Sequence, residues 1–163
     1  MPRKLEIYRK KFLGIFFIIF AFLITNSLGN EYKLGNLKIN HPYIMETPKG
    51  AVTAAGYMEI VNKGDQTDYL SIIKVNFAKT AEIHETKMEN DMIKMQKVEG
   101  GLEISAHGSV KLKHGTYHIM FMKLSKPMIK GETHEGILYF EKAGKIKVIF
   151  AVEKMGFKLQ ENN

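Results

Sequence analysis

In the stretch Tyr117-His118-Ile119-Met120-Phe121-Met122, aromatic or aliphatic side chains alternate strictly with histidine and methionine. Successive side chains of a β-strand point to opposite faces, so Ile119 and Phe121 face one layer while His118 and Met120 face the other. This period of two favours a half-buried strand over an amphipathic helix. The stretch therefore predicts a strand that sends one apolar face into a core and carries an imidazole and a thioether on its other face.

The rest of the chain repeats this pattern in short segments separated by turn-forming residues. The turn signals are Asn62-Lys63-Gly64-Asp65, Glu99-Gly100-Gly101, His114-Gly115 and Lys142-Ala143-Gly144. We predict strands over residues 37–45, 54–62, 69–77, 81–87, 92–98, 102–104, 109–112, 117–123, 136–141 and 146–152. No amphipathic helix of useful length is visible. Regularly spaced short strands of this kind predict an all-β sandwich or barrel.

The first 29 residues differ in character from the rest. A basic start is followed by 14 apolar residues over 12–25, fewer than the roughly 20 of a membrane-spanning helix and typical of a secretory signal. Ser27 and Gly29 fit the small residues before a cleavage site. We expect a cleaved signal peptide over 1–29 and one domain over 30–163 with its core at about 37–152. An uncleaved N-terminal anchor, which would tie the protein to a membrane, is the competing interpretation.

The composition limits which partners the protein is expected to bind and how its fold is stabilised. Five basic residues and one acidic residue leave with the signal, so the formal net charge of +7 falls to +3. The remaining lysines are scattered along the sequence and do not form the basic cluster that is typical of nucleic-acid-binding proteins. The chain has no cysteine, so no disulfide holds the fold and no lipid is attached through a cysteine. A hydrophobic core has to stabilise the domain.

Four residues stand out as candidate metal ligands: His84, Met95, His118 and Met120. Thioether sulfur is a soft ligand and imidazole a borderline one, so a site that combines them favours Cu(I) over Mg²⁺ or Ca²⁺. Adjacent strands lie about 4.8 Å apart, and a hairpin would therefore bring Met95 near His84. The structural alternative is that each methionine fills a gap in the core and each histidine is a surface residue.

These residues resemble the periplasmic copper chaperones called PCu(A)C. His84 and Met95 enclose ten residues, and His118-Ile119-Met120 supplies the closing His-X-Met triplet of that family. The segments 54–62, 68–70 and 138–144 resemble the family's early strand, next strand and late hairpin. Between Met95 and His118 lie twenty-two residues, one more than in the family pattern, and we place the extra residue in the Gly100-Gly101 turn.

The resemblance implies a cupredoxin-like β-sandwich that binds Cu(I) through His84, Met95, His118 and Met120. It also implies a periplasmic carrier, not an enzyme, that passes copper to a receiving protein. That protein would be the copper subunit of a respiratory cytochrome oxidase or another copper chaperone. A monomer is the simplest expectation for such a shuttle.

Two other functions are weighed against the carrier. A secreted β-sandwich interaction module would need no metal, and His118 and Met120 would then only pack or face solvent. A copper-dependent enzyme would need a cluster of bases, which is not visible, and the familiar nucleophile, phosphate-loop and zinc-helix motifs are missing. We expect His41, His107, His114 and His134 to be solvated, and Met88 and Met92 to pack onto the sandwich.

Overall fold

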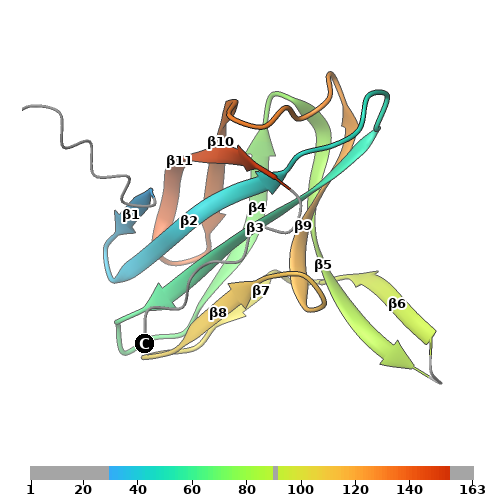
Figure 1. The fold of residues 1–163 in the computed structure, drawn as a ribbon. Coiled ribbons are helices and arrows are strands. Elements are labelled where there is room, and N and C mark those ends of the chain that lie inside the picture. Colours follow the sequence, from blue (N-terminus) through green and yellow to red (C-terminus); the bar gives the residue numbers. More distant parts are fainter. Residues whose placement is uncertain (1–29, 90–91, 155–163) are drawn as a thin grey trace, which may run out of the picture.

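A computed structural model describes residues 30–89 and 92–154, and this part of the chain is built entirely of strands and turns (Figure 1). The strands are β1 (Glu31–Leu34), β2 (Leu37–Met45), β3 (Thr53–Asn62), β4 (Asp68–Val75), β5 (Ala78–Glu89), β6 (Met92–Lys97), β7 (Leu102–Ile104), β8 (Ser109–Leu112), β9 (Tyr117–Leu124), β10 (Thr133–Phe140) and β11 (Gly144–Glu153). The expected signal peptide lies outside the described residues. Within them, no helix is long and apolar enough to cross a membrane.

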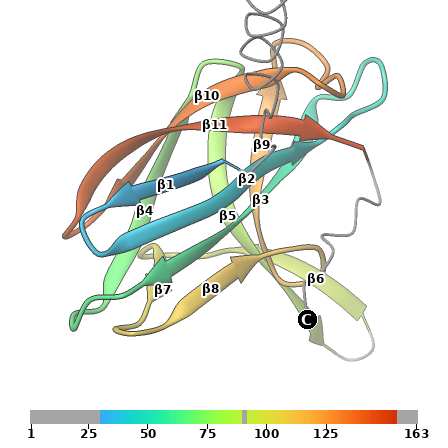
Figure 2. The ribbon, with the colours of Figure 1, turned by 60° about the vertical axis from the view of Figure 1, so that its left-hand side comes forward.

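The strands form one continuous path that folds over into two layers (Figures 1 and 2). Its order is β6-β5-β9-β8-β3-β2-β11-β10-β4-β7, with β1 paired to β2. Pairing is antiparallel except between β11 and β2 and between β8 and β9. The predicted all-β sandwich is confirmed.

The core lies between the two layers and is made by alternate residues of the strands. Phe121 of β9 meets Phe150 of β11 edge to face, with ring centroids 5.7 Å apart, and Phe77 packs 5.0 Å from Phe121 on another side. Ile119 and Phe121 are fully buried, as the alternation in 117–122 predicts. Gly56 makes room for this packing, because a Cβ atom there would lie 2.5 Å from Cε2 of Phe121.

The ten predicted strands are all present, with small differences at their ends. β5 is longer than expected, 78–89 instead of 81–87, and β10 runs over 133–140 instead of 136–141. The predicted strand 69–77 ends at Val75, and Phe77 follows in a bend that turns its ring into the core. β1 was not expected. It pairs with β2, and the hydroxyl of its Tyr32 accepts a hydrogen bond of 2.9 Å from the backbone N–H of Ile149.

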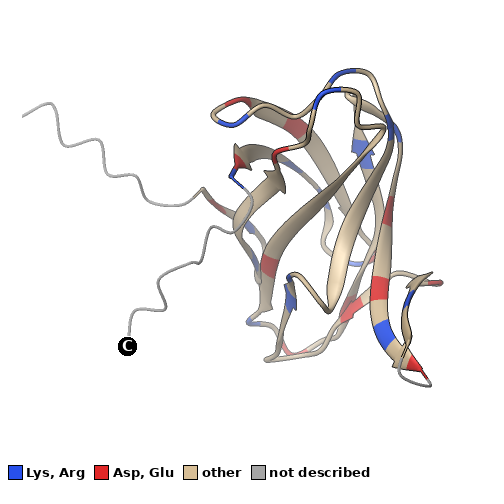
Figure 3. Ribbon diagram, turned by 45° about the vertical axis from the view of Figure 1, so that its right-hand side comes forward, with Lys and Arg blue, Asp and Glu red and all other residues tan. Residues whose placement is uncertain are grey.

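A long hairpin made by β5 and β6 projects from the sandwich (Figure 1). The first part of β5, up to residue 85, pairs with β9, and its last part, from His84 onward, pairs with β6. Within the described residues β6 pairs with no other strand, so it forms one end of the sheet. Acidic and basic positions are interspersed along the strands and turns (Figure 3), in keeping with the scattered lysines of the sequence.

Candidate metal centre

His84 and His118 lie directly opposite each other on β5 and β9. Their ring centroids are 5.9 Å apart and their planes are inclined by 49°. The flanking pair Ile83 and Ile119 enters the core, so the two imidazoles share the outer face of the sheet because side chains alternate along each strand. The antiparallel register therefore brings together two residues that are 34 positions apart in the sequence.

Burial sets the protonation of His118. The residue is only 5% exposed. Burial lowers the pKa of its imidazole, and the nearby imidazoles of His84 and His114 act in the same direction, whereas a hydrogen bond to the backbone of Thr116 opposes them. A lowered pKa keeps the ring neutral at pH 7, and only the neutral imidazole offers a lone pair to a metal ion.

Met120 and Met95 lie on the same outer face, on either side of His84. Met120 is opposite Glu82, and Met95 is opposite Thr86. Each methionine is therefore a diagonal cross-strand neighbour of His84, at about 7–8 Å, which long side chains can bridge. His84 is the one residue of the four that borders the other three. Met120 is partly buried, whereas Met95 is 58% exposed on the outermost strand.

Glu82 is a member of this cluster that the sequence did not single out. Its Oε2 lies 3.2 Å from Nε2 of His84, and its Oε1 lies 3.7 Å from Nζ of Lys97 on β6. The signal was present in the sequence, since residues two apart on a strand share a face. Recognising Glu82 as a member of the cluster also required knowing that the two imidazoles share its face.

The hairpin has two unlike faces. Met88, Ile93 and Met95 continue the face of His84, and all three are more than half exposed. The other face carries the ion pairs Lys87–Glu85 and Lys94–Glu89. The expectation that Met88 and Met92 pack onto the sandwich is wrong: they are 70% and 58% exposed, because the hairpin projects beyond the body of the domain.

The other histidines divide into two groups. His107 and His114 lie in exposed turns, as expected. His134 is not solvated: its side chain is 9% exposed and its ring centroid lies 4.9 Å from that of Phe77. His41 is also largely covered, and its Nε2 lies 2.7 Å from Oε1 of Glu153. The contacts that cover these two rings come from residues far away along the chain, Phe77 for His134 and Glu153 for His41, which the sequence around each histidine does not reveal.

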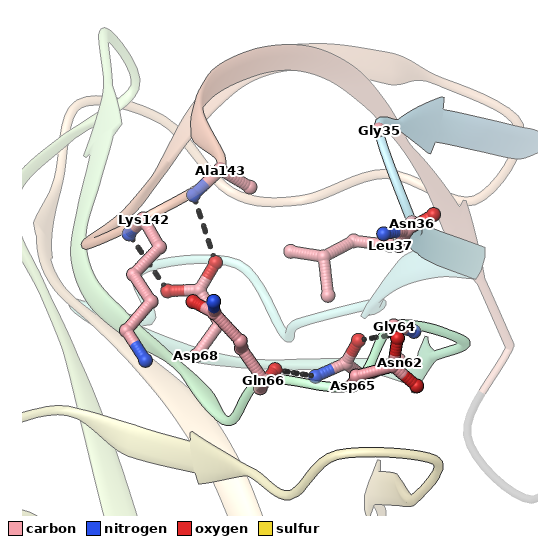
Figure 4. A pocket seen from close by; sticks show the side chains of 10 residues that line it. All are labelled: Gly35, Asn36, Leu37, Asn62, Gly64, Asp65, Gln66, Asp68, Lys142 and Ala143. Carbon is pink, nitrogen blue, oxygen red and sulfur yellow. Dashed lines mark hydrogen bonds between the residues drawn. The ribbon is translucent and has the colours of Figure 1, made fainter.

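Two hollows of the surface are formed by other parts of the sheet or border the cluster only at Glu82. One cleft of about 370 Å³ is lined by the turns at Gly35-Asn36, Gly64-Asp65 and Lys142-Ala143, together with Asn62 and Asp68 (Figure 4). The Asp68 carboxylate accepts hydrogen bonds from the backbone N–H groups of Tyr69, Lys142 and Ala143 at 2.8–2.9 Å, so it holds a turn in place. A second hollow of about 490 Å³ follows β4 and β5 and includes Glu82 and Lys97. None of the four candidate ligands lines either hollow.

Among residues 30–89 and 92–154, no group of three or more His, Cys, Asp or Glu side chains is arranged to hold a metal ion. The cluster on the outer face is of another kind, with two imidazoles and two thioethers.

The two-layered fold is that of a cupredoxin-like β-sandwich domain. Residues 37–152 match the model of the LpqE-like lipoprotein family, and the chain belongs to this family. The resemblance to PCu(A)C proteins is thereby confirmed. No curated protein matches the chain.

Solved structures agree with this assignment. The chain is similar to the copper-bound PCuAC domain from PmoF2, with 28% identity, a TM-score of 0.67 and coverage of 77% of this chain and 98% of that one. It is also similar to the apo PCuAC domain from PmoF1, with 26% identity, a TM-score of 0.66 and coverage of 77% and 99%. The Cu(I) form of DR1885 from Deinococcus radiodurans shares the fold at 23% identity and a TM-score of 0.59, with coverage of 81% and 86%.

Proposed function

We propose that this protein is an exported copper chaperone that binds one Cu(I) ion through His84, Met95, His118 and Met120. The observation that carries the proposal is the opposed pair His84 and His118, with a methionine diagonal to His84 on each side. The likeness to a copper-bound PCuAC domain supports the choice of metal.

The chemistry of the donor set fits a carrier of monovalent copper. Two thioethers and two imidazoles are uncharged soft or borderline donors, which suit Cu(I). A chain without cysteine has no thiol that oxidation could convert to a disulfide outside the cytoplasm. We place the protein in the periplasm, after removal of residues 1–29, where it acts as a monomer and as a carrier with no catalytic step.

Exposure on the hairpin supports transfer to a second protein. Met95 is the outermost of the four residues, and it stands in a row with the exposed Met88 and Ile93. A receiving protein that approaches over this face reaches Met95 first. A ligand of the receiving protein therefore replaces the Met95 thioether before copper dissociates from the buried His118. We propose that this receiver is the copper subunit of a respiratory cytochrome oxidase or another copper chaperone.

The same apolar hairpin face favours one alternative function, a protein-interaction module that binds no metal. Exposed apolar surface of this kind marks contact sites in many soluble proteins. The two functions differ in what the purified protein does with copper alone.

Anaerobic titration with Cu(I) against a competing chromophoric chelator tests the proposal. We expect the protein to withdraw one equivalent of copper from the chelator, and we expect the double variant His84→Ala/His118→Ala to withdraw none. Circular dichroism of the variant checks that the sandwich remains folded, which has to be established because His118 is only 5% exposed. A wild-type protein that leaves the chelator fully loaded refutes the carrier and supports the interaction module.

A further inference from the structure

The contact between Glu82 and His84 bears on which ring nitrogen of His84 meets the metal. Glu82 Oε2 lies 3.2 Å from Nε2 of His84. A neutral imidazole has one N–H and one lone pair, and a carboxylate accepts hydrogen bonds but does not donate them. The contact is therefore a hydrogen bond only when Nε2 carries the proton, which leaves the lone pair on Nδ1.

We infer that Glu82 is a positioning residue that holds His84 in the Nε2–H tautomer and so presents Nδ1 to Cu(I). This inference rests on the proposed function and adds to it a residue that is not one of the four ligands. Metal-binding histidines commonly donate their second ring N–H to a carboxylate, which fixes both the tautomer and the direction of the ring.

Glu82 is itself in contact with a basic residue of β6. Its other carboxylate oxygen, Oε1, lies 3.7 Å from Nζ of Lys97, and Lys97 is the residue directly opposite His84 on β6. On the other side, the residue of β9 that lies opposite Glu82 is Met120. Glu82 therefore stands between the body of the sheet and the strand that carries Met95, at a side-chain exposure of 30%. One carboxylate ties the orientation of His84 to the base of the hairpin.

The neighbouring Glu85 offers a matched control. It lies on the opposite face of β5 and pairs with Lys87 at 2.8 Å. Glu85→Ala removes the same charge from the same strand without touching the imidazole. Glu82→Gln is a second test, since its amide can accept a hydrogen bond from Nε2–H or donate one to an unprotonated Nε2, and so it no longer selects one tautomer.

Long-range ¹H–¹⁵N correlation spectra of the copper-free protein at about pH 8, above the ordinary imidazole pKa, report the tautomer directly. We expect His84 as the Nε2–H form in the wild type and in Glu85→Ala, and a mixture of tautomers in Glu82→Ala and in Glu82→Gln. A wild-type His84 protonated on Nδ1, or a Glu82→Ala variant with an unchanged tautomer, overturns the inference. This measurement needs no copper, so its outcome does not depend on the proposed function.

The same spectra after addition of one equivalent of Cu(I) complete the test. We expect the resonance of Nδ1 of His84 to move while Nε2 keeps its proton, and we expect Glu82→Ala to bind Cu(I) about 10–100-fold more weakly, with Glu85→Ala unchanged. Copper bound through Nε2 in the wild type overturns the inference and leaves the proposed function intact. A wild type that binds no copper refutes the proposed function and with it the role of Nδ1.

Discussion

His84 on β5 and His118 on β9 are an opposed cross-strand pair whose ring centroids lie 5.9 Å apart. Their separation is set by the backbone hydrogen bonds of two paired strands and not by a loop. Strand-borne side chains keep their positions better than loop-borne ones. The two imidazoles are therefore a prearranged half of the proposed site, and Met120 on β9 and Met95 on β6 supply the other half.

Replacing the methionine on the His84 face of β6 should weaken Cu(I) binding, and replacing the methionine on the other face should not. Met95 and Met92 are each 58% exposed on the same strand, but Met95 shares the face of His84 while Met92 is opposite Glu89 on the other face. We expect Met95→Leu to weaken Cu(I) binding at least tenfold, because it removes a soft donor, and Met92→Leu to leave binding unchanged. Chelator competition measures both. Equal affinities for the two variants would exclude Met95 as a ligand.

A methyl group added at Gly56 should disrupt the core. A Cβ atom there would lie 2.5 Å from Cε2 of Phe121, and overpacking of this kind costs about 1–3 kcal/mol. The backbone entropy that alanine saves is worth only about 0.5–1 kcal/mol, so the clash decides the sign. We expect Gly56→Ala to lower the free energy of unfolding in urea. Phe121→Leu in the Gly56→Ala background should recover part of the loss, and a simple sum of the two losses would argue against the contact.

Loss of the Asp68 carboxylate should loosen the turn between β10 and β11. Three backbone N–H groups donate to it, and hydrogen bonds to charged groups contribute more than neutral ones. We expect Asp68→Ala to lower the free energy of unfolding by about 2–4 kcal/mol. Asp65→Ala, whose side chain is 93% exposed beside the same cleft, should change it by less than about 0.5 kcal/mol. Similar losses in the two variants would show that Asp68 is not a special support.

Acid should destabilise the copper-free protein through its buried histidines. Burial lowers the pKa of His134, assisted by the charge of Lys126 and opposed by Glu132. The folded pKa then lies below the unfolded value of about 6.5, so the unfolded chain takes up the proton first as the pH falls. Stability is therefore complete above about pH 6.5 and declines as the pH falls toward the folded pKa. The lowered pKa of His118 adds to this decline.

Urea unfolding at about pH 7.5, 6.5 and 5.5 measures the effect while most carboxylates stay ionised. We expect His134→Gln to flatten the decline relative to the wild type. His107→Gln, whose side chain is 65% exposed in the wild type, should leave the slope as it is. A His134→Gln protein with the wild-type slope would show that this residue does not carry the dependence.

Local periodicity and the turn signals between segments were sufficient to predict ten of the eleven strands. The periodicity also assigned Ile119 and Phe121 to the core and His118 and Met120 to the outer face. The donor types, read with the absence of cysteine, indicated copper before any fold was known. β1 was missed because Glu31–Leu34 is only four residues long, although its exposed and partly buried side chains do alternate.

The sequence by itself determined the strands, the faces of their side chains and the chemical nature of the donors, since these depend on neighbours along the chain. Only the tertiary structure decided that His84 stands opposite His118, that Glu82 reaches His84 on the shared face, and that His134 is buried against Phe77. These relationships depend on register between distant strands, and a slip of one residue between β5 and β9 would move His84 out of alignment with His118. Backbone hydrogen bonds and the burial of Ile83 and Ile119 in one core select a single register.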